Sequence, residues 1–282
     1  IVVGGGSADS VVAARLSESG RHRVLLLEAG PDDQTWSLRN FFVQMPLGYA
    51  KSYNDRRVNW RYHSEPNPGL GGRSVYVPRG RILGGSSSIN ALVYVQGQPQ
   101  DYDGWEALGN PGWGAAEVRR LYRKLEMHPY GPSEHHGDGG PLGITDLDGR
   151  VHPLCAHYLN AASELGLKVN PDYNGESQEG VAPYQATLRH GRRASASRSY
   201  LWPARHRPNL RIVTHARATR ILFEGLRAVG VAYSRHGRPY EARATGEVIL
   251  AAGAVNTPKL LQLSGVGSGL SLALKGVAVQ HD

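Results

Sequence analysis

The sequence predicts an α/β fold that combines a parallel sheet with a three-stranded antiparallel meander. Two observations predict this fold. The first thirty residues read as strand, glycine-rich turn, helix and strand, which is the order of a βαβ unit. The segment at about 218–245, in contrast, contains three strand-like runs. They are separated by the turn dipeptides Glu224-Gly225 and His236-Gly237.

The βαβ unit starts with the apolar run Ile1–Val3 and three consecutive glycines. Apolar residues then recur from Ala8 to Leu16 at the spacing of one helix face, and Gly20 is the expected C-terminal cap. The next run, Val24–Glu28, is apolar and ends in an acid, as expected of a buried parallel strand whose end meets a ligand.

Further elements follow from the same periodicities. A helix is expected at about 115–127, where apolar residues recur at helical spacing, and Leu210–Thr214 reads as a short strand. The run Val248–Ala252 returns to a buried strand. Thr257-Pro258 is then expected to cap and open a helix over Lys259–Leu263.

Composition excludes several classes of protein. The chain of 282 residues is 40% apolar and 20% charged, which is typical of a globular protein. Its net charge of +8 comes from arginines spread along the whole chain, so a nucleic-acid surface is not expected. Uncharged apolar stretches such as Val248–Val255 are too short to span a membrane. The single Cys155 excludes an internal disulfide and cysteine-based metal cages, and we expect a cytoplasmic location, with peripheral membrane association as an alternative.

The glycine-rich turn has the chemistry of a phosphate site. Gly4 and Gly6, placed between a strand and a helix, allow a pyrophosphate to approach the N–H groups at the helix N-terminus. Glu28 follows 24 residues after Gly4, where a carboxylate accepts hydrogen bonds from ribose hydroxyls. The ordered set predicts a Rossmann-like dinucleotide-binding sheet. The simpler alternative is a glycine-rich turn beside an exposed glutamate.

Asp9 departs from this pattern, because the third position of the motif normally holds a glycine. A carboxylate is favourable at a helix N-terminus, but there it competes with a phosphate. Repulsion between the two anions is expected to cost about 1 kcal/mol or more of binding free energy. We therefore expect weaker cofactor binding than a glycine at position 9 would give.

Two longer segments carry a resemblance to a known family. Gly80–Asn90, together with Tyr94, resembles the first signature of the glucose–methanol–choline (GMC) oxidoreductases, and Gly253–Gly267 is similar to their second. Other matching segments run in the family's order along the whole chain, among them Leu27–Gly30 and His136–Leu142. The choline dehydrogenase-like branch is the most similar.

The resemblance implies FAD as the cofactor. It places Gly4, Gly6 and Ser7 at the pyrophosphate, Glu28 at the ribose, and Ala218 at the adenine. The residues implied to line the flavin and its ribityl chain are Arg81, Gly84, Gly85, Ser86, Asn90, Ala91, Leu92 and Val93. Ala251, Ala252 and Gly253 would pass beneath the cofactor, and Ala29 adjoins Glu28 in the implied site. Ile89 stands where some members carry a flavin-linking histidine, so FAD is expected to be non-covalent.

The resemblance also implies an alcohol substrate and hydride transfer to the flavin. The family's catalytic histidine and its His or Asn partner are expected beyond Asp282, so we name no catalytic residue in this chain. His135-His136 is expected to be an ordinary loop pair, with no metal bound. The implied domains are an FAD-binding part at 1–150, a partial substrate domain at 151–207, and a second FAD-binding part at 208–282. A fragment with these parts is expected to be inactive by itself.

Two alternatives stay open at this point. One is a nicotinamide-dependent dehydrogenase, against which the Gly84–Asn90 segment argues. The other is a degenerate or truncated FAD-binding protein without catalysis, which Asp9 favours. The sequence does not identify the alcohol, the electron acceptor or the oligomeric state, and it does not distinguish a dehydrogenase from an oxidase.

Overall fold

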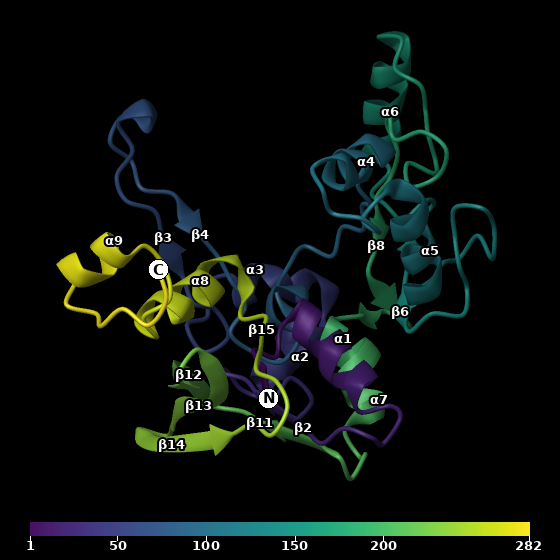
Figure 1. Ribbon diagram of the computed structural model, residues 1–282. Coiled ribbons are helices and arrows are strands. Elements are labelled where there is room, and N and C mark those ends of the chain that lie inside the picture. Colours follow the sequence, from purple (N-terminus) through teal and green to yellow (C-terminus); the bar gives the residue numbers. More distant parts are fainter. The chain divides into compact units, whose positions relative to one another are not determined.

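The computed structural model describes all 282 residues, which form two compact units. Unit 1 consists of Ile1–Asn90 and Ser195–Asp282, and unit 2 of Ala91–Ala194 (Figure 1). The boundaries expected from the sequence lie later, after residues 150 and 207. The difference arises because the start of unit 2 hydrogen-bonds with its end: the Tyr94 N–H donates to the Gln185 carbonyl oxygen at 2.9 Å.

The parallel sheet of unit 1 confirms the predicted βαβ unit. Its strand order is β11-β2-β1-β15. The strands are β1 (Val2–Val3), β2 (Val24–Leu27), β11 (Leu210–Val213) and β15 (Ile249–Leu250), and every pairing is parallel. Val2 lies opposite Leu26 on one side and Ile249 on the other, so β1 is central. The run at 210–214 is a strand as predicted, and it joins this sheet.

Helix α1 (Ser7–Leu16) connects β1 to β2 and packs on the sheet. Ala13 and Leu26 are completely buried in a core that also contains Leu201. The helix ends at Leu16 and Ser17 is its C-cap, so the expectation that Gly20 caps it is wrong. Gly20 lies in the following turn, where its φ of 74° is accessible to glycine at little cost.

The antiparallel meander is also confirmed. It consists of β12 (Ala216–Glu224), β13 (Arg227–Arg235) and β14 (Arg238–Arg243), with glycines at positive φ in both turns. Helix α8 (Gly253–Leu263) packs against β12, and the Ile221 N–H donates to Ser264 Oγ at 2.8 Å. The expectation that Thr257-Pro258 opens this helix is wrong, because Ala252 is the N-cap and Pro258 lies inside the helix.

Shorter elements complete both units. In unit 1 these are α2 (Leu38–Gln44), α3 (Tyr49–Ser52), β3 (Tyr62–His63), β4 (Tyr76–Val77), α7 (Trp202–Ala204) and α9 (Gly269–Leu274). Unit 2 holds α4 (Pro99–Ala107), α5 (Ala115–Leu125), β5 (Glu126–Met127), β6 (Leu142–Gly143), β7 (Thr145–Asp146), α6 (Leu154–Glu164), β8 (Gln185–Ala186), β9 (Leu188–Arg189) and β10 (Arg192–Arg193). Helix α5 confirms the helix predicted at about 115–127. None of the helices has the length and apolar character that a bilayer-spanning segment needs.

Leu26 provides a test of the core beneath the sheet. The substitution Leu26→Ala removes a fully buried side chain and should lower the free energy of unfolding by about 3 kcal/mol. Leu226→Ala is the matched control, because Leu226 is 73% exposed in a turn and its loss should cost about 0.5 kcal/mol or less. Urea unfolding followed by circular dichroism measures both. Equal effects of the two substitutions would contradict the assigned core.

Candidate cofactor-binding site

A pocket of about 510 Å³ opens at the carboxyl ends of β1, β2 and β15. Its walls include the turn at 3–9, the end of β2 at 27–29 and the segment at 251–256. The chain leaves β1 toward β2 on one side, whereas β15 joins on the other side. Ligands of open α/β sheets bind in the crevice at such a reversal of strand order.

The turn after β1 leads the chain directly from the sheet into α1. Gly4 has a φ of 113°, which a residue with a side chain rarely adopts, and its N–H donates to the Leu27 carbonyl oxygen at 2.9 Å. The first N–H groups of α1 have no acceptor within the helix, and the helix dipole adds positive potential there. The start of α1 therefore offers donors to an anion in the pocket.

The serine-rich segment lies against this turn. The Gly84 N–H donates to the Gly5 carbonyl oxygen at 2.6 Å. Gly85 has a φ of 54°, and a Cβ atom on it would lie 2.7 Å from the Gly6 Cα atom. Because no side chain fits between them, the two glycines let the backbones touch, and Gly85 and Ser86 reach the wall of the pocket.

Glu28 is held at the end of β2 by two backbone donors. Its Oε2 atom accepts from the Gly5 N–H at 2.8 Å and its Oε1 atom from the Gly30 N–H at 2.7 Å. Only 6% of the residue is exposed, so the alternative of an exposed glutamate is wrong. Burial raises the pKa of Glu28 to about 7, although the two hydrogen bonds and the charge of Arg81 act in the opposite direction.

Asp9 occupies the start of the helix. It is completely buried, and its Oδ2 atom accepts from the Gly6 N–H at 2.8 Å, in the manner of a capping box. Its Oδ1 atom is buried without a hydrogen-bond partner. Burial, together with the nearby charge of Glu28, raises the pKa of Asp9 to about 7. One of the N–H groups expected to face a pyrophosphate is thus already paired with a carboxyl group.

The structure brings most of the predicted site residues to this one pocket. Those on its walls are Gly4, Gly6, Ser7, Glu28, Ala29, Gly85, Ser86, Ala218, Ala251, Ala252 and Gly253. Three others in unit 1, Arg81, Gly84 and Asn90, do not line it. Of these, Gly84 donates its N–H to the Gly5 carbonyl oxygen in the turn. The Arg81 guanidinium lies 5.5 Å from the ring centre of Trp60, which does line the pocket. Ala91, Leu92 and Val93 belong to unit 2, and their place in the site stays a prediction.

Sequence reasoning assigned no site role to several residues that line the pocket. The rings of Trp60 and Tyr62 are stacked with their centres 6.0 Å apart, and the Tyr62 hydroxyl donates to Asn256 Oδ1 at 2.6 Å. Three cationic residues also line the walls: Arg79, Arg217 and Lys259. The positions of these cations in the sequence carry no recognisable pattern. Only the fold brings their charges together at one pocket.

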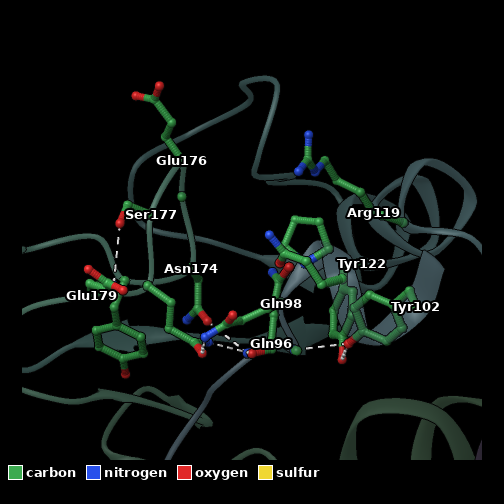
Figure 2. A pocket seen from close by; sticks show the side chains of 16 residues that line it. Gln96, Gln98, Tyr102, Arg119, Tyr122, Asn174, Glu176, Ser177 and Glu179 are labelled. Carbon is green, nitrogen blue, oxygen red and sulfur yellow. Dashed lines mark hydrogen bonds between the residues drawn. The ribbon is translucent and has the colours of Figure 1, made fainter. Parts of the chain in front are cut away.

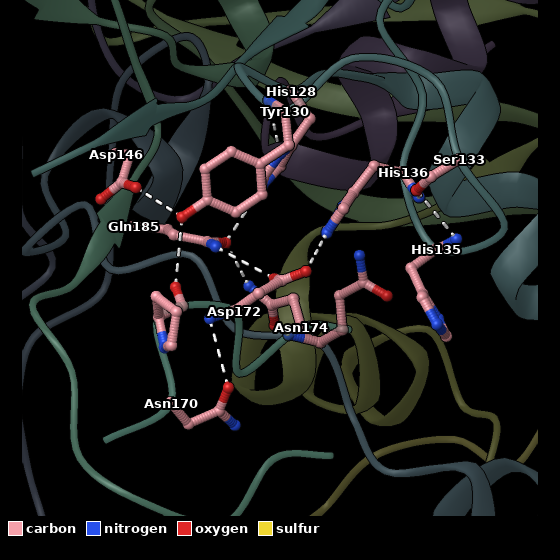
Figure 3. Close-up of polar contacts among 12 residues, drawn as sticks. His128, Tyr130, Ser133, His135, His136, Asp146, Asn170, Asp172, Asn174 and Gln185 are labelled. Atoms are coloured by element: carbon pink, nitrogen blue, oxygen red, sulfur yellow. Dashed lines mark hydrogen bonds and ion pairs between the residues drawn. The ribbon is translucent and has the colours of Figure 1, made fainter. Parts of the chain in front are cut away.

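Unit 2 contains a buried polar network (Figure 3). The Glu126 carboxylate accepts from the Tyr94 hydroxyl at 2.6 Å and lies 3.3 Å from His136 Nδ1. His136 Nε2 points at Asp172, 2.9 Å from its Oδ2 atom. Burial lowers the pKa of His136, but hydrogen bonds to Glu126 and Asp172 outweigh it and raise the pKa overall. His136 therefore links two carboxylates that lie 46 residues apart in the sequence.

Other residues extend this network. The ring of His128 stacks on that of His136 with 3.7 Å between the ring centres, and His128 Nε2 lies 3.1 Å from Gln185 Oε1. Sequence reasoning missed His128, because no partner spacing marks it. No group of three or more His, Cys, Asp or Glu side chains is arranged to hold a metal ion. The arrangement joins β5 to the segment before β8, which is a structural role.

Unit 2 also has a polar pocket of about 240 Å³ (Figure 2). Amide side chains and two tyrosines form much of its wall, and the Gln96 N–H donates to Asn174 Oδ1 at 2.7 Å. The hydroxyls of Tyr102 and Tyr122 lie 3.3 Å apart. The starts of α4 and α5 also reach this pocket, through Pro99 and Ala115. The N–H groups of Gln98 and Ala115 already donate to Asp101 Oδ2 and Asp103 Oδ1, both at 2.9 Å.

Comparison with known proteins assigns the family. The family model described as GMC oxidoreductase matches residues 1–272. The chain belongs to the GMC oxidoreductase family. It is 45% identical to the alcohol dehydrogenase (acceptor) of Pseudomonas putida over 285 residues, covering 100% of this chain and 50% of that protein. It is 44% identical to the mitochondrial choline dehydrogenase of Mus musculus over 271 residues, covering 95% of this chain and 45% of that protein.

Solved structures of other GMC-like enzymes share the fold. The pyridoxine 4-oxidase from Mesorbium loti superposes with a TM-score of 0.93 at 35% identity, covering 100% of this chain and 54% of that chain. An FAD-dependent oxidoreductase from Chaetomium thermophilum gives a TM-score of 0.89 at 32% identity, covering 100% of this chain and 50% of that chain. The chain thus spans about half the length of the curated relatives it matches.

The contact between Gly85 and the turn can be tested by adding one methyl group. Gly85→Ala combines a positive φ with a clash against Gly6, whereas Gly72→Ala combines a positive φ of 75° with open space. We expect Gly85→Ala to lower the free energy of unfolding by about 2 kcal/mol more than Gly72→Ala does. Chemical denaturation of both variants measures the difference. Similar losses would show that the segment does not pack on the turn.

Proposed function

We propose that this chain binds FAD in the pocket at the edge of the parallel sheet, as the cofactor-binding part of an alcohol oxidoreductase of the choline dehydrogenase type. The observation that carries the proposal is that distant segments of the chain meet at one pocket. The turn at 4–7, Glu28, Gly85 and Ser86, and Ala251–Gly253 are widely separated in the sequence and line one pocket. Membership of the GMC family and the similarity to FAD-dependent and alcohol-oxidising proteins support it.

The residues present fit an anionic dinucleotide at most positions. Ser7 and its neighbours at the start of α1 would hold the pyrophosphate, and Glu28 would accept from a ribose hydroxyl. Ala218, at the edge strand of the meander, would contact the adenine. The cationic side chains of Arg79, Arg217 and Lys259 line the same walls and add the positive potential that attracts such a ligand.

The alcohol chemistry needs a proton acceptor that these residues do not supply. Bound FAD provides the hydride acceptor in enzymes of this type. None of the chain's 12 histidines lines the pocket, and its titratable side chains are Asp9, Glu28, Tyr62, Arg79, Arg217 and Lys259. Asp9 and Glu28 are engaged by backbone N–H groups. We therefore propose that residues outside this set remove the alcohol proton and that the 282 residues alone do not oxidise alcohols.

A second candidate function is FAD binding without catalysis. Asp9 favours it, because a carboxyl group on the Gly6 N–H opposes an anionic cofactor. The first candidate is preferred, because the rest of the pocket retains the small residues and the backbone approaches that a dinucleotide needs.

Flavin binding is the first test of the proposal. The purified protein, incubated with FAD and desalted, should show flavin absorbance in a ratio close to one FAD per chain. Because Ile89 stands where a linking histidine would be needed, acid or heat denaturation should release all of the flavin into the supernatant. Yellow colour that stays with the precipitated chain would contradict non-covalent binding, and retention of NAD in place of FAD would contradict the cofactor.

Catalysis is tested separately. The FAD-loaded 282-residue chain, mixed with choline or simple primary alcohols and an artificial electron acceptor, should reduce the dye no faster than free FAD does. A relative such as the Pseudomonas putida alcohol dehydrogenase serves as the positive control. Dye reduction that depends on both the alcohol and this chain would show that the residues present include a sufficient base.

A further inference from the structure

Asp9 is the pocket residue whose chemistry opposes the proposed ligand. Its Oδ2 atom lies 2.8 Å from the Gly6 nitrogen and takes the hydrogen bond that a phosphate oxygen would otherwise accept. A carboxylate and a phosphate that approach the same N–H group repel each other strongly where water is excluded. The fit of a pyrophosphate to this turn therefore depends on the charge of Asp9.

The surroundings of Asp9 favour its neutral form. The residue is completely buried, and its Oδ1 atom has no hydrogen-bond partner. Burial and the charge of Glu28 together raise the pKa of Asp9 to about 7. A protonated carboxyl group, unlike a carboxylate, has an O–H that can donate to an acceptor in the pocket.

We propose that FAD binding to this chain is coupled to protonation of Asp9, so that a neutral carboxyl group faces the pyrophosphate. The inference rests on the proposed function as an FAD-binding protein. When the carboxylate is present, binding takes up one proton from solvent, which forms an O–H bond on Asp9, and no other bond is made or broken. The neutral group removes the repulsion and offers its O–H to a phosphate oxygen.

The charged and titratable groups around Asp9 show which of them could take up a proton in its place. Glu28, at the end of β2, is the anion that acts on Asp9, and Arg81 acts on Glu28 in turn. From the π-helical turn at 197–201, Tyr200 lies against Arg15, near the other end of α1, and Arg198 Nη1 lies 3.5 Å from Gln34 Oε1. On the pocket side the charged residues are Arg79, Arg217 and Lys259. Glu28 is thus the one competing source of a bound proton at this site.

The sign of the pH dependence follows from this coupling. If only the neutral form of Asp9 admits the pyrophosphate, the affinity for FAD is constant below pH 7. The Kd of FAD then rises about fivefold between pH 7 and 8 and approaches about tenfold per pH unit at higher pH, because the fraction of neutral Asp9 falls in the same proportion. A pyrophosphate diester keeps the same charge over this range, so the ligand adds no slope of its own.

The test compares three forms of the protein expressed from its complete gene. Asp9→Asn keeps the shape and a donor but cannot ionise, and Glu18→Gln removes an exposed carboxylate just beyond the C-terminus of α1 as the matched control. Quenching of flavin fluorescence gives the Kd of FAD from pH 6 to 8.5. Calorimetry at pH 8 in two buffers with different ionisation heats gives the number of protons taken up.

For the wild type and Glu18→Gln, we expect the Kd to rise about fivefold between pH 7 and 8 and uptake of close to one proton at pH 8. For Asp9→Asn, we expect a Kd at pH 8 within about threefold of the wild-type value at pH 6, and proton uptake near zero. A wild-type Kd that does not change with pH would overturn the inference. So would proton uptake that survives in Asp9→Asn, since the proton would then reside elsewhere, with Glu28 as the nearest candidate.

The two proposals fail in different ways. If Asp9→Asn binds FAD but the wild type binds it at no pH, Asp9 blocks the site permanently, and the proton coupling is wrong although the pocket is an FAD site. If neither protein binds FAD at any pH, the proposed function itself is wrong, and the inference falls with it.

Discussion

The parallel pairing of β1 with strands on both of its sides is the constraint on which the rest of the structure depends. Val2 and Val3 pair with β2 through the first thirty residues and with β15 from nearly 250 residues along the chain. Because parallel strands end at the same edge, the turn after β1, the acid after β2 and the small residues after β15 come together there. Each of these segments alone is a weak indication of a binding site. Together, at one edge of the sheet, they form one.

Close backbone contacts then fix the depth of the pocket. Gly30 approaches so closely that a Cβ atom on it would lie 1.9 Å from the Arg81 carbonyl oxygen, and Gly85 touches Gly6 in the same way. These glycines hold the serine-rich segment on the sheet edge without side chains between the two backbones. Along this contact the two backbones meet directly, and the buried carboxyl groups of Asp9 and Glu28 lie beside it.

Local sequence patterns predicted the parts of the fold that local forces decide. The helix from Ser7, the strand ending at Leu27 and the three meander strands follow from apolar spacing and turn glycines, and all are present. The expected start of α8 at Lys259 lies six residues after the observed start at Gly253, because Pro258 resembles a helix opener whereas the helix follows directly from β15. The unit boundaries differ because long-range hydrogen bonds, which no local pattern shows, join Tyr94 to the segment near Gln185.

The site was predictable to a similar degree. Motif residues such as Gly4 and Glu28 were identified because their spacing has a chemical meaning, whereas Arg217 and Lys259 reach the pocket only through the fold. The pairing of Asp9 with the Gly6 N–H also needed coordinates, although the sequence already marked Asp9 as a departure.

A crystal structure of the protein grown with FAD tests the central claim most directly, namely that the common edge of β1, β2 and β15 is the cofactor site. The account predicts pyrophosphate density at the start of α1, over Ser7, with the adenosine ribose beside Glu28. FAD bound elsewhere, for example in the polar pocket beside Gln96 and Asn174, with the sheet edge empty, would contradict it.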